Sequence, residues 1–144
     1  MTVDNLLKRN ISKPLQCQFC TEFESSPHLF FECIVARNAW HYVDVRTDVK
    51  IRSYEDMACK WPCGGNYEIV NCISAGVCWG IWLTRNDMVF NRQIWRSIKT
   101  VLGAIWRCII TWKPMLKDQV AAGVDLWCSY LEGAITSPLA IKAA

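Results

Sequence analysis

The chain has 144 residues, of which 52% are apolar and 20% are charged, and its formal net charge is +3. This length suits one domain that buries its own core, with at most a small appendage. The first ten residues hold no apolar core of signal-peptide length, so we expect an intracellular protein, nuclear or cytoplasmic, with reduced cysteines. The longest uncharged run, residues 69–84, is shorter than the ~20 residues of a membrane span, which argues against a membrane protein.

The charges are unevenly distributed along the chain. Residues 1–60 carry eight basic and eight acidic side chains, a net charge of 0. Residues 61–116 carry six basic against two acidic side chains, a net charge of +4. Residues 117–144 carry two basic against three acidic side chains, a net charge of −1. The basic excess therefore lies in the middle of the chain, among apolar residues.

A short helix is expected over residues 3–9. Asp4 can cap its start, and Lys8 and Arg9 lie near its end, where cations interact favourably with the helix dipole. Pro14 cannot continue a helix and is expected to end this one.

The most informative stretch has the spacing Cys-x2-Cys-x7-His-x4-Cys, formed by Cys17, Cys20, His28 and Cys33. Two thiolates two residues apart can bind one ion from a tight turn, and a nearby His and third Cys can complete a tetrahedron. Three sulfurs and one imidazole suit Zn²⁺. Because all four positions are filled by protein, the pattern predicts a structural zinc site and not a catalytic one. Nine cysteines in the chain make some Cys-x2-Cys pairs arise by chance, but chance rarely adds the His and the third Cys.

Apolar residues follow the motif at helical spacing. Some of Leu29, Phe30 and Phe31 are expected to pack beneath the metal and limit the access of water. Residues 34–43 predict a helix whose buried face includes Trp40, packed back on the Phe pair, while Arg37 faces away. Residues 1–43 are thus expected to form a zinc-binding knuckle with flanking helices.

Residues 44–67 are polar and end in a Gly- and Pro-containing stretch, which predicts a linker loop. Four cysteines in and beyond this loop could form a second metal site: Cys59, Cys63, Cys72 and Cys78. Their spacing is loose and no His lies close by, so we favour ordinary buried or exposed thiols.

The remaining chain predicts a helical region over residues 68–132 and a frayed tail over 133–144. Residues 68–90 read as a long helix that is apolar nearly all round, which indicates a central helix or one with a partner. Residues 92–113 give an amphipathic pattern, and residues 116–131 a weaker one. The stripe of the second helix is Ile94, Ile98, Val101, Ile105, Ile109 and Trp112. The predicted fold is mainly α: a small Cys3His zinc knuckle followed by a helical bundle.

Beyond the four metal ligands, several segments carry a family resemblance. They are Asp4–Arg9, Glu24, His28–Cys33, Ala36-Arg37, Trp40 and Trp79–Asn91. Together they resemble the reverse-transcriptase zinc-binding domain of plant LINE-type (non-LTR) retrotransposons, over residues 4–43 and again over 76–92. The resemblance implies a domain that follows a polymerase and helps to hold RNA or the DNA target. Since no polymerase precedes it, the resemblance also implies a truncated chain.

Catalytic chemistry is not indicated. Tyr54-Glu55-Asp56-Met57 is similar to the Tyr-x-Asp-Asp box of polymerases, but Met57 stands where the second carboxylate should hold a metal. His41 has no orienting partner in the sequence and is expected to be a partly exposed helix residue. We therefore expect a protein that is not an enzyme.

The first functional hypothesis is a nucleic-acid-binding module that contacts RNA or single-stranded DNA. Phe19, between the first two cysteines, is the candidate for base stacking, and Lys8, Arg9, Lys13 and Arg37 are the candidates for phosphate contacts. The zero net charge of residues 1–60, and the acidic Glu22, Glu24 and Glu32 on the knuckle, predict weak, salt-sensitive binding.

The second hypothesis is a zinc-folded structural module. In it the apolar helices of residues 68–113 form a homo-oligomer or dock on a protein partner, as their Trp and Ile content suggests. A third is a remnant of the element without a selected function. The sequence does not separate these alternatives.

Overall fold

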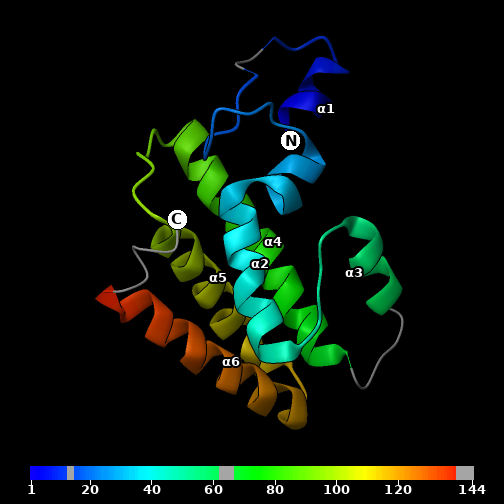
Figure 1. The fold of residues 1–144 in the computed structure, drawn as a ribbon, viewed down its shortest axis with the longest axis vertical. Helices are drawn as coiled ribbons and strands as arrows, with labels where there is room; N and C mark the ends of the chain where they lie inside the picture. The colour runs from blue at the N-terminus through cyan, green and yellow to red at the C-terminus, as the bar shows by residue number, and fades with distance from the viewer. Residues whose placement is uncertain (13–14, 62–66, 139–144) are drawn as a thin grey trace.

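Helices make up most of the secondary structure in the computed structural model, which describes residues 1–12, 15–61 and 67–138. The fold is mainly α with the knuckle near its N-terminus, as predicted (Figure 1). In chain order the elements are α1 (Val3–Leu7), a single π-helical turn η1 (His28–Glu32), α2 (Ile34–Thr47), α3 (Tyr54–Lys60), α4 (Glu68–Phe90), α5 (Ile98–Trp112), a 3₁₀ turn η2 (Lys113–Met115) and α6 (Asp118–Thr136).

Helix α4 is the centre of the bundle. It packs on α5 most extensively and also contacts α2, α6, α3 and η1, so nearly every face of it is covered. Its predicted all-round apolarity is explained by this position: Ile73, Val77 and Ile81 are completely buried. Figure 1 shows α2 in front of α4, with α5 and α6 to one side and α3 to the other. None of the helices in the described part of the chain is long and apolar enough to cross a bilayer.

Helices α4 and α5 approach so closely that their backbones touch. A Cβ atom added to Gly80 would lie 2.8 Å from the backbone nitrogen of Ile105 and 2.9 Å from its Cα. At Gly76, one turn earlier, an added Cβ would lie 2.5 Å from the Ile109 side chain. Glycine is required at position 80 because the backbone of α5 cannot move without repacking the core.

The sequence prediction for α4, residues 68–90, is confirmed, but the helix predicted over 92–113 begins only at Ile98. The Gln93 amide donates a hydrogen bond of 3.2 Å to the Asp87 carbonyl, which closes α4, and Arg92 has a left-handed φ of 52° that turns the chain away. Ile94, which we expected on the buried stripe, is 81% exposed. Residues 91–97 are instead a connecting segment.

The segment predicted as a linker loop, residues 44–67, is largely helical in its described part. Helix α2 continues to Thr47, Ile51 is only 1% exposed, and α3 occupies Tyr54–Lys60. The Ser53 hydroxyl accepts a hydrogen bond of 3.1 Å from the Asp56 amide and so caps the start of α3. Residues 62–66, and with them Cys63 of the suggested second metal site, lie outside the described residues.

The last helix is longer than expected, since α6 runs over Asp118–Thr136 instead of 116–131. Trp127 in this helix donates its indole N–H to the Tyr42 carbonyl over 3.1 Å, which joins α6 to α2. The predicted tail from residue 133 therefore begins inside a helix, and residues 139–144 lie outside the described residues.

Replacing Gly80 with alanine should destabilise the fold by about 1–3 kcal/mol, the usual cost of forcing extra volume into a packed core. The measurement is the free energy of unfolding in urea. Gly133→Ala is the matched control: Gly133 is also helical, but no atom lies within 4 Å of its added Cβ. That variant should gain about 0.5–1 kcal/mol from helix propensity. Equal effects of the two substitutions would contradict the close contact between α4 and α5.

Candidate metal centre

The four predicted ligands come together at one point. A tight turn presents Cys17 and Cys20, closed by hydrogen bonds from the Cys17 amide to the Glu22 carbonyl (2.8 Å) and from the Glu24 amide to the Leu15 carbonyl (3.0 Å). His28 begins η1, and Cys33 follows its end. The π-helical turn is closed by a 2.8 Å hydrogen bond from the Cys33 amide to the His28 carbonyl, and it brings both side chains to the same side.

The ligand atoms have the spacing of a tetrahedral zinc site. The Cys33 sulfur lies 3.9 Å from that of Cys17 and 3.8 Å from that of Cys20, and the Cys20 sulfur lies 3.2 Å from Nε2 of His28. All four ligand atoms lie within 4.8 Å of one another. A tetrahedron with Zn–S bonds of about 2.3 Å has sulfur–sulfur edges of about 3.8 Å. The residues present therefore fit Zn²⁺, with all four ligands supplied by the protein.

The surroundings of the ligands fix their positions. Cys17, His28 and Cys33 are buried, and Cys20 is partly buried. The Ser25 hydroxyl accepts a 3.1 Å hydrogen bond from the His28 amide, as expected of a residue that caps this turn. Phe31 is 3% exposed, and its ring stacks on Trp40 at 5.7 Å and 13°. The Trp40 indole donates a 2.7 Å hydrogen bond to the Phe30 carbonyl. The prediction that Trp40 packs back on the Phe pair is confirmed.

The thiols influence one another before a metal enters. The hydrogen bond to Cys33, together with burial, raises the pKa of Cys17, while the same hydrogen bond lowers the pKa of Cys33. Burial raises the pKa of Cys20. Because zinc binds thiolates, its binding must release the protons of these thiols. The affinity of the site for zinc therefore falls as the pH falls.

A buried ion pair joins the knuckle (residues 17–33) to the helical bundle. The Arg85 guanidinium of α4 binds the Glu24 carboxylate through two hydrogen bonds, Nη2 to Oε1 at 2.6 Å and Nε to Oε2 at 3.1 Å. The two side chains are only 4% and 0% exposed. The Val3 amide donates a third hydrogen bond to Oε1 over 3.2 Å. One carboxylate therefore holds α1, the knuckle and α4 together.

This pair was not predicted from the sequence, since 61 residues separate its members. By sequence, Glu24 is one of three acidic residues on the knuckle and Arg85 is one of six basic residues in the middle of the chain. The signal was available, because Glu24 and Arg85 both lie in the segments that carry the family resemblance. What was missing was the fold that brings them together.

The first forty residues match a known family. A family model described as zinc-binding in reverse transcriptase matches residues 1–40. Together with the Cys3His cluster, this match supports a reverse-transcriptase zinc-binding domain over residues 1–40. Comparison with curated proteins finds no match, and comparison with solved structures finds none either.

The zinc-binding domain does not end structurally where the family match ends. Residue 40 lies inside α2, which continues to Thr47 and packs on α4 and α5. The Glu24 carboxylate of the domain pairs with Arg85, which lies well outside the matched residues 1–40. The helices beyond residue 40 therefore complete the domain's core.

The residues predicted to contact nucleic acid occupy different environments. Phe19 is 8% exposed, and its ring packs edge-on against Trp95 with centroids 5.0 Å apart, so it is a core residue in this structure. That contact occupies the ring that we expected to meet a base. Lys8, Arg9 and Arg37 are exposed as expected, and Lys13 lies outside the described residues.

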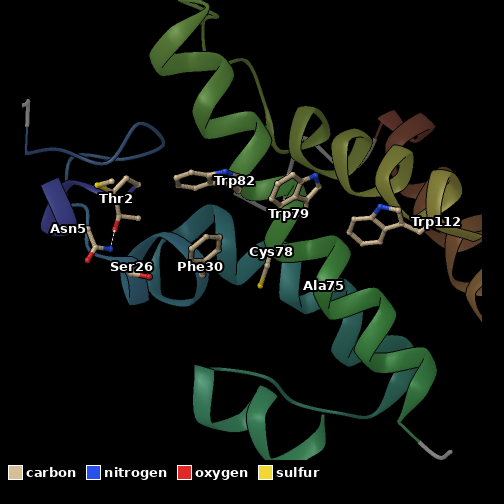
Figure 2. Close-up of a pocket in the computed structure, with 10 residues that line it drawn as sticks. Thr2, Asn5, Ser26, Phe30, Ala75, Cys78, Trp79, Trp82 and Trp112 are labelled. Atoms are coloured by element: carbon tan, nitrogen blue, oxygen red, sulfur yellow. Dashed lines mark hydrogen bonds between the residues drawn. The ribbon is translucent and has the colours of Figure 1, made fainter. Parts of the chain in front are cut away.

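A second feature next to the knuckle is an open, mostly apolar groove of about 490 Å³. Phe30, Trp79, Trp82 and Trp112 supply its rings, and Trp79 is 47% exposed. Figure 2 shows Trp82 beside Phe30, Trp79 between this pair and Trp112, and Thr2, Asn5 and Ser26 at the far end. We call this the tryptophan groove. No charged side chain lines it among the described residues.

Protein purified with reduced thiols should contain one zinc ion per chain, measured by mass spectrometry under native conditions. Cobalt substitution should give the absorption spectrum of a tetrahedral thiolate site. Cys20→Ser should lose the metal and change the fluorescence of Trp40 and Trp95, which contact residues of the knuckle. Cys59→Ser, an exposed position outside the cluster, should retain both. A zinc-free, fully folded wild-type protein would contradict the site.

Replacing Arg85 with methionine should destabilise the protein by about 3–5 kcal/mol, because it leaves the buried Glu24 carboxylate without its charge partner. The matched control is Lys117→Met, which removes an ion pair to Glu68 whose side chains are 81% and 36% exposed. That pair should contribute less than about 1 kcal/mol. Urea unfolding of both variants, each loaded with zinc, makes the comparison. Similar losses in the two would show that the buried pair does not hold the fold.

Proposed function

We propose that this protein is a non-catalytic zinc module that binds single-stranded nucleic acid. The observation that carries the proposal is the pair Lys8 and Arg9, which are exposed at the end of α1. Neither forms a direct ion pair among residues 1–12, 15–61 and 67–138. Lysine and arginine in this state are available to phosphate groups, which supply most of the affinity in nucleic-acid binding. The family resemblance supports a further proposal, descent from a LINE-type retrotransposon.

The buried ion pair removes one objection to nucleic-acid binding. Glu24 was one of three acidic residues expected to repel phosphate from the knuckle. Its carboxylate is completely buried and neutralised by Arg85, so only Glu22 and Glu32 remain exposed on this segment. The zinc centre itself carries a net negative charge, since three thiolates outweigh one dication. We therefore expect weak binding that depends steeply on salt.

The non-catalytic part of the proposal is supported by the placement of the polymerase-like tetrapeptide. Tyr54 and its neighbours lie in α3, and the Asp56 carboxylate accepts a 2.7 Å hydrogen bond from the Arg52 amide. A carboxylate that caps its own helix in this way has a structural role.

The second candidate function is docking of a protein partner on helices 68–113. The tryptophan groove favours it, because half-exposed indole rings in an uncharged groove are typical of interface cores. Ile105, on the stripe that suggested this function, is completely buried between α4 and α5 and cannot meet a partner. Sedimentation of the Trp79→Ala variant against wild type tests this second function.

Titration of the zinc-loaded protein with labelled single-stranded RNA and DNA at two salt concentrations tests the first function. Replacing both Lys8 and Arg9 with alanine should weaken binding several-fold at low salt. It should also reduce the slope of log affinity against log salt by about one per lost phosphate contact. Lys117→Ala, an exposed cation at the start of α6, is the control and should change neither. Absence of binding by the wild type even at low salt would refute the proposal.

A further inference from the structure

We propose that the nucleic-acid strand crosses a groove between α1 and the end of α4, with residues 91–97 as its second cationic wall. This inference rests on the proposed function and names the surface that performs it. The groove has a volume of about 530 Å³. Its lining includes Val3, Leu6, Ile11, Gln18, Met88 and Phe90. We call it the α1–α4 groove.

The interior of the groove suits a nucleobase. Its lining is mostly apolar, and the Arg85 side chain that lines it is already bound by Glu24. Phe90 is 69% exposed, so a face of its ring is available at the groove. Stacking on an aromatic ring holds an unpaired base without regard to its sequence. Phe90 therefore takes the role for which Phe19 is too deeply buried.

Cations stand next to the groove residues in the chain, and we place them along its two sides. Lys8 and Arg9 lie between the groove residues Leu6 and Ile11 in the chain, and Arg92 and Arg96 follow Phe90. All four are exposed, and the ion pairs of the described residues involve none of them. Cations on both sides of an apolar floor complement a single strand, whose phosphates flank its bases.

The second wall exists only because α5 starts late. If residues 92–97 continued a helix, Arg92 and Arg96 would lie on the outside of the bundle. Instead the left-handed Arg92 turns the chain, and Trp95 packs against Phe19 of the knuckle with centroids 5.0 Å apart. This contact holds the segment beside the zinc site. Two cations from the middle of the sequence are thus brought to its N-terminal domain.

The nearby carboxylates do not cancel this arrangement. Asp4 accepts a hydrogen bond from the Thr2 hydroxyl, and Asp87 accepts one of 2.9 Å from the Asn91 side chain. Glu22 is exposed on the knuckle and opposes binding. Four cations against these three carboxylates and the negative zinc centre leave no large excess of either sign, which fits a weak site for a polyanion.

The test compares variants of the zinc-loaded full chain with labelled oligo-uridine RNA, oligo-thymidine DNA and a matched duplex. Replacing both Arg92 and Arg96 with alanine should weaken single-strand binding several-fold and lower the salt slope by about two. Phe90→Ala should weaken binding about fivefold or more at both salt concentrations with an unchanged slope, because stacking is not ionic. Ile94→Ala, 81% exposed in the same segment, is the control and should leave binding unchanged. Zinc content and circular dichroism confirm that each variant is folded.

The outcomes separate this inference from the proposed function. If replacing Lys8 and Arg9 weakens binding but the changes at Phe90, Arg92 and Arg96 do not, the α1–α4 groove is refuted and the nucleic-acid function stands. Binding of the duplex as tightly as the single strand refutes stacking in the groove. If the wild type binds none of the three probes, both proposals fail.

Discussion

The structure depends on one buried ion pair, between Glu24 of the knuckle and Arg85 of α4. Two buried charges are costly to desolvate, so such a pair persists only when both members are well hydrogen-bonded. Here the guanidinium binds the carboxylate through two bonds and the Val3 amide supplies a third. Three segments that are distant in sequence are held at one point. The pair favours this arrangement over others, because any shift of α4 against the knuckle would leave a buried charge without its partner and without water.

The zinc centre and the ion pair act on different scales. Zinc fixes the local path of residues 17–33, in which the single turn η1 is the one helical element. The ion pair, the Trp40 contacts and the Phe19–Trp95 contact then attach this segment to the bundle. Within the bundle, the contact of Gly80 with the backbone of α5 sets how near the two central helices lie. The zinc-binding domain and the helices behind it consequently share one core.

This shared core changes how the charges of the chain are interpreted for function. By sequence, residues 1–60 are neutral and the basic excess lies elsewhere. In the folded chain, Glu24 is neutralised and buried, while Arg92 and Arg96 lie on the segment that Trp95 holds against the knuckle. The knuckle end is therefore more favourable to a polyanion than its own sequence indicates. The tryptophan groove is lined by α4, α5, η1 and the first residues, and no charged side chain lines it among the described residues. This is why we propose it, and not the knuckle, as the surface for a protein partner.

The sequence by itself determined the zinc ligands, the mainly helical fold, the bounds of α4 and the packing of Trp40 on the Phe pair, because these follow from short spacings and local periodicity. Tertiary structure alone decided the Glu24–Arg85 pair, the burial of Phe19, the helix α3 within the expected linker and the late start of α5. These depend on contacts between residues far apart in the chain. Periodicity continued through Ile94, but the closed end of α4 and the contact of Trp95 with the knuckle overrode it. Local patterns show which residues can be helical or bind metal, whereas only the packed chain decides which side chains remain for a ligand.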